Sequence, residues 1–216
     1  MGMLRLLRDE TGAALVEATV MMAIVLTFVL GSVDFLFAFY QWNAAAKAVE
    51  MGARIAAVST PLANGLNSLS TSVLSSSLHL GDTMPSFTVT CNAGGGGGCS
   101  CSGTCSGVSG FNASALNDIV YGRGNAACGD ATSFYDAGMC DIFPRIQPAN
   151  VQIVYAQTGL GYAGRNGGPV PTITVSIQNL PFQFFFLSGL LGFANINMPG
   201  LQTTITGEDL SSVAPP

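Results

Sequence analysis

Six cysteines are the residues of this sequence with the clearest potential chemistry, and all of them lie between residues 91 and 140. An even, clustered set predicts disulfide bonds formed in an oxidising compartment. A zinc site is the competing interpretation, but the sequence has no C-x2-C pair and His79 is its only histidine. We therefore expect disulfides and no metal, with Cys128 and Cys140 as the predicted local bridge. The candidate disulfide residues are Cys91, Cys99, Cys101, Cys105, Cys128 and Cys140.

Residue patterns for catalysis are sparse. His79 has no second histidine to work with, no serine lies in a G-x-S-x-G motif, and the acidic residues form no obvious pair. A G-x-G-x-x-G pattern at 159–164 follows a predicted strand, but the segment from Arg165 to Pro169 cannot open the helix that a dinucleotide site needs. We expect no enzymatic activity and no cofactor.

Glu17 is the only charged residue in an apolar run from residue 13 to 33, AALVEATVMMAIVLTFVLGSV. A charge inside a membrane span is costly and indicates a function unless it reaches the polar headgroups. Two interpretations follow. Glu17 takes part in contacts with another subunit, or it extends to the nearby membrane surface as long side chains do.

The apolar run itself predicts a membrane-spanning helix, because about 21 residues at 1.5 Å each cross roughly 30 Å. It is too long for the hydrophobic core of a signal peptide, and no small-x-small cleavage site follows it. Arg5 and Arg8 precede the run and the next basic residue is Lys47, which predicts a cytoplasmic N-terminus. Helical character continues to Gly52 and beyond without a proline, so we expect one helix of about 45 residues.

Composition agrees with an anchored, exported protein. Hydrophobic residues make up 49% of the chain and charged residues 9%, whereas soluble proteins have about 25% charged residues. The net charge is −5 and the basic residues form no patch, so nucleic acid is not an expected partner. Small residues on the helix extension predict close packing, either on the protein's own domain or on another subunit; they are Ala45, Val49, Gly52, Ala53, Ala56 and Ala57.

Gly12, four apolar residues and Glu17, behind a short basic leader, resemble the cleavage motif of type IV prepilins and pseudopilins. Together with Gly31 to Phe35 and Ala53 to Ala57, this stretch is similar to the TadE/TadG family, which accompanies the Tad (tight adherence, Flp-type) pilus machinery; the similarity extends loosely to 151–155, 171–176 and 203–210. The resemblance implies cleavage between Gly12 and Ala13 by a prepilin peptidase. Ala18 stands where Tad prepilins often carry Tyr or Phe, and an uncleaved chain would be a permanently anchored component.

Beyond the helix we expect a single exported domain. Leucines at 66–78 predict a surface helix, and further helices are expected at about 113–121 and 132–143. Alternating patterns predict strands at 87–90, 151–155, 172–177 and 201–206, the middle two as a hairpin, whereas the glycine run at 94–98 predicts a flexible loop. The apolar stretch 180–193 is too short to span a membrane and predicts a buried core helix or a membrane-surface patch.

These observations predict an α+β protein in which a long N-terminal transmembrane helix continues into a small exported domain with a short antiparallel sheet and disulfide-stapled loops. The expected parts are a cytoplasmic leader (1–12), a transmembrane helix (13–34), a helix extension (35–58) and a periplasmic or extracellular domain (59–216) with a Cys/Gly-rich insertion at about 91–140. The resemblance implies a minor pilin or pseudopilin-like component of Tad pilus assembly and surface adhesion in the bacterial inner membrane. Its implied partners are other Tad pilins or pseudopilins, the Tad assembly platform and the prepilin peptidase. The alternative is a membrane-anchored adhesin or binding module that is not incorporated in a fibre.

Overall fold

The computed structural model describes residues 10–94, 96–191, 196–207 and 210. The helix α2 (Glu10–Ala57) begins the described chain, and five strands form the only sheet in this part of it. The chain divides into two compact units. The first contains α2 up to Gln41 and the segment Phe182–Ile196, and the second contains Trp42–Pro181 and the chain from Asn197 onward.

The 48-residue helix α2 confirms the prediction of one continuous helix through the apolar run and its extension. Leu, Met and Ala are strong helix formers, and no proline occurs before Pro61. The helix ends at Ala57, where the N–H of Val58 turns back to the carbonyl of Ile55 at 3.2 Å. Pro61 follows a few residues later and prevents the helix from resuming.

The sheet has the strand order β2-β1-β3-β4-β5, and every neighbouring pair is antiparallel. Its strands are β1 (Phe87–Asn92), β2 (Gly98–Gly103), β3 (Val151–Ala156), β4 (Thr172–Ile177) and β5 (Leu201–Thr206). The β3–β4 hairpin and the last strand were predicted from alternation and are confirmed. The glycine run was predicted as a flexible loop, but its last residue opens β2, which pairs with β1.

The hydrophobic core lies on one face of this sheet. Alternate residues of β1, β3 and β4 are buried, and the pairs Val89–Tyr155 and Ile153–Val175 face each other across the strands. Tyr155 is fully buried, and its hydroxyl accepts a hydrogen bond from the backbone N–H of Leu62 at 3.2 Å. This bond ties the segment that follows α2 to the middle of the sheet.

Two helix predictions were too long. The expected surface helix at 66–78 is reduced to a 3-10 turn (Leu66–Ser68) and the single turn α3 (Leu69–Ser72), and Leu66 and Leu69 are fully buried. The expected helix at 132–143 is a 3-10 turn (Phe134–Asp136) followed by α5 (Met139–Ile142), while α4 (Ala113–Val120) matches its prediction. The chain is extended at Gly138, with φ −101° and ψ −172°, and a Cβ there would meet the backbone of Val120 and Gly122.

Candidate membrane anchor and assembly site

The N-terminal part of α2 presents apolar side chains outward on all sides. Leu15, Met22, Phe28 and Val29 are each at least half exposed, and the most apolar window of the helix, with mean hydropathy 2.3, has no buried share. The core helix of a soluble protein would be mostly buried, so this exposure and length fit a single-pass membrane anchor. The polar side chains along it bond within the helix: Thr19, Thr27 and Ser32 each donate to a carbonyl three or four residues earlier at 2.8 Å.

Gly12, Ala13 and Glu17 all lie on this exposed helix. One turn separates Ala13 from Glu17, so the α-amino group that cleavage after Gly12 would create and the Glu17 carboxylate are about 6 Å apart along the axis. Among the described residues, none forms an ion pair with Glu17. The cleavage and assembly roles of these three residues therefore stay predictions.

Asp34 is fully buried, although it follows the apolar run directly. Its Oδ1 accepts a hydrogen bond from the backbone N–H of Phe185 at 3.0 Å, and its Oδ2 accepts from Phe186 at 2.8 Å and Leu187 at 2.7 Å. Gln41, also buried, makes a two-way pair with Gln183: its Nε2 donates to the Gln183 carbonyl at 2.8 Å, and its Oε1 accepts from the Gln183 N–H at 3.0 Å.

These contacts correct the expectation for 180–193. Among its described residues the segment contains one short helix, α6 (Leu187–Leu191), and Phe185 and Phe186 keep 64% and 43% of their surface exposed. It is therefore not a buried core helix. Pro181 and the glycines at 189 and 192 limit helix length, so the segment cannot form the long apolar face that a core helix buries.

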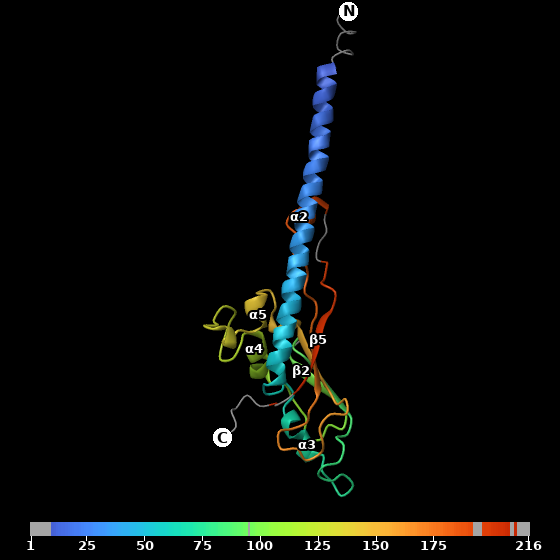
Figure 1. Ribbon diagram of the computed structural model, residues 1–216, viewed down its shortest axis with the longest axis vertical. Helices are drawn as coiled ribbons and strands as arrows, with labels where there is room; N and C mark the ends of the chain where they lie inside the picture. Colours follow the sequence, from blue (N-terminus) through green and yellow to red (C-terminus); the bar gives the residue numbers. More distant parts are fainter. Residues whose placement is uncertain (1–9, 95, 192–195, 208–209, 211–216) are drawn as a thin grey trace, which may run out of the picture. The chain divides into compact units, whose positions relative to one another are not determined.

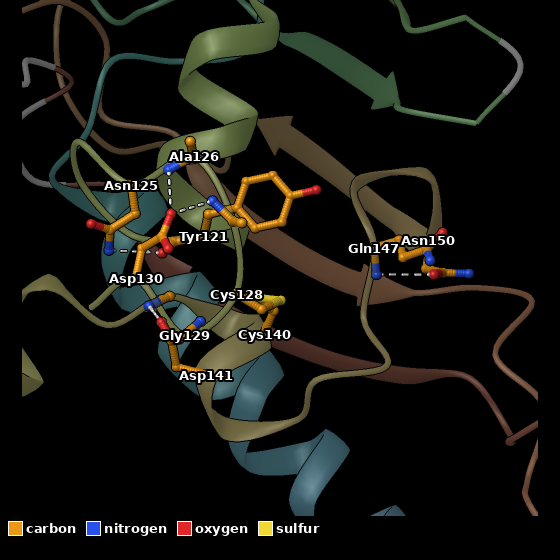
Figure 2. The surroundings of a disulfide bond; sticks show 12 residues. Tyr121, Asn125, Ala126, Cys128, Gly129, Asp130, Cys140, Asp141, Gln147 and Asn150 are labelled. Atoms are coloured by element: carbon orange, nitrogen blue, oxygen red, sulfur yellow. Dashed lines mark hydrogen bonds between the residues drawn. A yellow bond between two sulfur atoms is a disulfide. The ribbon is translucent and has the colours of Figure 1, made fainter. Parts of the chain in front are cut away.

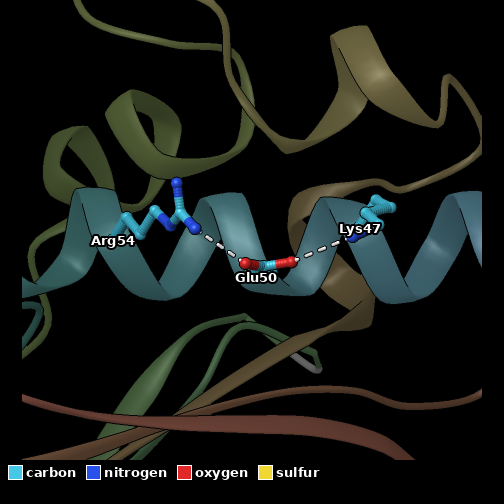
Figure 3. Close-up of polar contacts among 3 residues, drawn as sticks. All are labelled: Lys47, Glu50 and Arg54. Atoms are coloured by element: carbon cyan, nitrogen blue, oxygen red, sulfur yellow. Dashed lines mark hydrogen bonds and ion pairs between the residues drawn. The ribbon is translucent and has the colours of Figure 1, made fainter.

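The small-residue stripe of α2 packs on the protein's own domain. Ala45, Val49, Ala53 and Ala56 are buried within the second unit, and a Cβ on Gly52 would meet the side chain of Met139 in α5. Figures 1 and 3 show this part of α2 with sheet strands on one side and the α4–α5 region on the other. Of the two interpretations of the stripe, packing within the chain is the one the structure supports.

The outward face of the same helix segment carries a short charge network. Glu50 accepts from Arg54 at 2.7 Å and from Lys47 at 3.5 Å (Figure 3). All three side chains are substantially exposed, so these pairs contribute little to stability.

All six cysteines form disulfides, which confirms the expectation of disulfide bonds. Cys91–Cys99 joins directly opposite residues of β1 and β2, and Cys101–Cys105 ties β2 to the following turn. Cys128–Cys140, the bridge predicted from the sequence, connects a surface loop to α5 (Figure 2). Asp141 supports that loop: its carboxylate accepts from the N–H of Gly129 at 2.9 Å and of Gly138 at 2.8 Å.

Catalytic groups are not brought together in the described part of the chain. His79 is exposed and lies 3.7 Å from Asp82, and no group of three or more His, Cys, Asp or Glu residues there could hold a metal ion. Burial raises the pKa of the Tyr155 phenol, which is enclosed in the hydrophobic core.

Comparison with known families adds a decisive observation: residues 12–54 match the model of the TadE-like protein family. This segment is TadE-like. The TadE-like match covers the exposed anchor, the Asp34 region and most of the small-residue stripe, and it ends before the sheet begins. No curated protein and no solved structure matches the chain.

The sequence reasoning missed the binding roles of Asp34 and Gln41. Neither residue was among the site residues predicted from the sequence, and the apolar stretch 180–193 was interpreted separately. A signal was present, since an acidic residue at the end of an apolar helix needs a partner and the uncharged stretch offers backbone N–H groups as donors. About 150 residues separate Asp34 and Gln41 from this stretch in the sequence, so the pairing was not predicted.

Proposed function

We propose that this chain is a minor pilin or pseudopilin-like structural component of the Tad (Flp-type) pilus system, acting in pilus assembly and surface adhesion. The observation that carries the proposal is the Gly12–Glu17 motif at the start of an exposed apolar helix that lies within the TadE-like match. A helix of this kind can leave the bilayer only by exchanging lipid contacts for contacts with other helices.

In this role the chain crosses the inner membrane once, with its N-terminus in the cytoplasm and the disulfide-bonded domain in the periplasm or on the pilus or cell surface. Cleavage by the prepilin peptidase between Gly12 and Ala13 would free an ammonium group one turn from Glu17. The Glu17 carboxylate of one subunit then neutralises the ammonium of a neighbour, which lowers the cost of both charges in an apolar fibre core. Other Tad pilins or pseudopilins and the Tad assembly platform are the proposed partners.

The fold supports an architectural role. The same helix provides the exposed apolar segment of the first unit and, among residues 45–57, buried side chains of the second unit. Three disulfides and a five-stranded sheet provide the stability that an exported domain needs outside the cell.

The test is a deletion strain of the source organism, complemented with the wild-type chain. We expect loss of pili, recovery on complementation, a mature protein that begins at Ala13, and the chain in the sheared fibre fraction or in complexes with the assembly platform. Normal piliation in the deletion strain would contradict the proposal. Normal piliation with weakened surface attachment would favour the alternative of an anchored adhesin outside the fibre.

A further inference from the structure

The segment 182–196 leaves the sheet between β4 and β5 and returns to the same place. Pro181 and Asn197 form a bridge at its base, and the N–H of Phe182 donates to the carbonyl of Ile196 at 2.8 Å. We call the described residues of this segment, 182–191 and 196, the phenylalanine excursion. Its two ends, at Phe182 and Ile196, are hydrogen-bonded together.

The phenylalanine excursion follows one face of α2 toward the N-terminus of the helix, and Figure 1 shows it in orange beside α2. Gln183 is held at Gln41, the N–H groups of residues 185–187 are held at Asp34, and a Cβ on Gly31 would lie 3.9 Å from Leu187. Positions 31, 34, 38 and 41 share one side of a helix. From Gln41 to Gly31 the excursion covers about 15 Å of the helix axis.

This direction brings the excursion to the level of the membrane. Residues 13–33 form the apolar span, so a segment that reaches Asp34 and Gly31 reaches the edge of the hydrocarbon layer. Phe185 and Phe186 are exposed there, and so are Phe35, Leu36 and Phe39 on the adjoining helix. The sequence from 166 to 207 contains no charged residue and no histidine. The excursion therefore carries no charge that would oppose its transfer into lipid.

A membrane contact of this kind also requires partners for the backbone N–H groups of the excursion, and Asp34 provides them. Non-helical backbone and the first turn of a helix have N–H groups without partners, and in hydrocarbon each unpaired group is costly. The Asp34 carboxylate accepts from three consecutive N–H groups of the excursion, and it is fully buried by doing so. The rings of Phe37 and Phe185, tilted at 44° with their centroids 4.9 Å apart, add an apolar contact at the same place.

We propose that the phenylalanine excursion is a second membrane contact of this protein. It inserts Phe185 and Phe186 into the lipid leaflet on the side of the folded domain, and Asp34 positions it against α2 at that depth. The occupant of this surface is the phospholipid bilayer, since the exposed apolar surface is continuous with the spanning helix. The inference requires only that α2 spans a bilayer and is independent of any role in a pilus.

The test measures the depth of a tryptophan placed in the excursion. Trp42 is the only tryptophan, so Trp42→Phe provides a background in which Phe186→Trp is the single fluorophore. The full chain is reconstituted in vesicles of phosphatidylethanolamine and phosphatidylglycerol containing phosphatidylcholine brominated near the glycerol or near the methyl end of its acyl chains. Tyr135→Trp, at a side chain 95% exposed in the second unit, is the matched control, and Phe185→Trp is a second reporter if the first variant folds poorly.

We expect blue-shifted emission for Trp at position 186 and a loss of intensity that is greatest with bromine near the glycerol end, whereas position 135 shows neither. Asp34→Asn should weaken this quenching, because an amide places an N–H against backbone N–H groups, while Glu50→Gln in the same helix should not. Solvent-like emission and no quenching at positions 185 and 186 would overturn the proposal. Quenching that disappears as the protein-to-lipid ratio rises would overturn it in favour of docking to another protein copy. Unchanged quenching in Asp34→Asn would overturn the positioning role.

Discussion

At the scale of single residues, Tyr155 places a polar hydroxyl group inside the core of the folded domain. Its hydroxyl lies in the core and is the partner of the Leu62 N–H at the point where the chain turns from α2 toward the sheet. Burial raises the pKa of this phenol, and the bond from Leu62 opposes the rise only in part. The protonated form is therefore the one that the fold requires.

Tyr155→Phe should lower the free energy of unfolding by about 1–3 kcal/mol, because the Leu62 N–H stays buried without its acceptor. The wild type should also lose stability as the pH rises above about 10, the pKa of an unfolded tyrosine, since only the unfolded chain ionises the phenol easily there. Tyr155→Phe should lack that part of the alkaline loss. Denaturant unfolding of the detergent-solubilised chain at several pH values measures both effects.

Tyr135→Phe is the control, because the Tyr135 side chain is 95% exposed. It should retain wild-type stability and wild-type alkaline dependence. Equal behaviour of the two variants would show that the buried hydroxyl contributes nothing specific.

Glu17 belongs to the same scale but acts between chains. Glu17→Ala should leave membrane insertion and cleavage after Gly12 intact, because it removes a charge from an apolar span, yet it should abolish pilus output. Thr19→Ala is a matched control, since Thr19 bonds only within its own helix, to Val16. Piliation assays and co-purification of pilins measure the result. Wild-type piliation and normal pilin recovery with Glu17→Ala would mean that Glu17 merely reaches the headgroups.

At the scale of elements, the contact between α2 and α5 depends on a missing side chain. A Cβ on Gly52 would lie 2.5 Å from Sδ and 2.8 Å from Cγ of Met139, which is fully buried. Glycine thus permits a close approach of two helices that the core needs. Alanine would be better than glycine in an isolated helix by about 1 kcal/mol, so the sign of a substitution here is decided by packing.

Gly52→Ala should destabilise the domain, because overpacking costs about 1–3 kcal/mol and Met139 has no solvent to move into. In a Met139→Ala background the same substitution should become neutral or stabilising, since its obstacle is gone. A double-mutant cycle of unfolding free energies measures this coupling. The same change in stability in both backgrounds would refute the packing explanation.

At the scale of the whole molecule, the chain consists of two compact units with different chemistry. The first combines the exposed apolar helix with the uncharged phenylalanine excursion, and the second contains the sheet, the disulfides and the buried part of α2. This division suits a protein that meets lipid with one unit and an oxidising, aqueous compartment with the other.

The orientation prediction belongs to this scale. Arg5 and Arg8 precede the span, and its far flank has no basic residue before Lys47, so the domain should face the periplasm. A reporter that is active only in the periplasm should be active when fused after Pro216, and a reporter that is active only in the cytoplasm should be silent at the same position. The reverse pattern would establish the opposite topology.

The sequence by itself determined the features that depend on local pattern. The apolar run, the absence of proline and the alternation in 151–155 and 172–177 predicted α2 and the β3–β4 hairpin, because helix and strand periods are read from neighbouring residues. The six clustered cysteines likewise predicted disulfides, and Gly12 to Glu17 indicated the TadE-like segment.

Tertiary structure decided what the periodicity of a single segment does not show. The strand β2, rich in glycine, serine and cysteine, has little intrinsic preference for a strand and forms through pairing with β1 and the Cys91–Cys99 bridge. Asp34 and Gln41 bind the phenylalanine excursion, which lies about 150 residues later in the sequence, and only the folded chain brings these partners together. The physical reason is common to both: a hydrogen bond or disulfide between two segments leaves no periodic trace in either segment, and only the folded chain shows which partners meet.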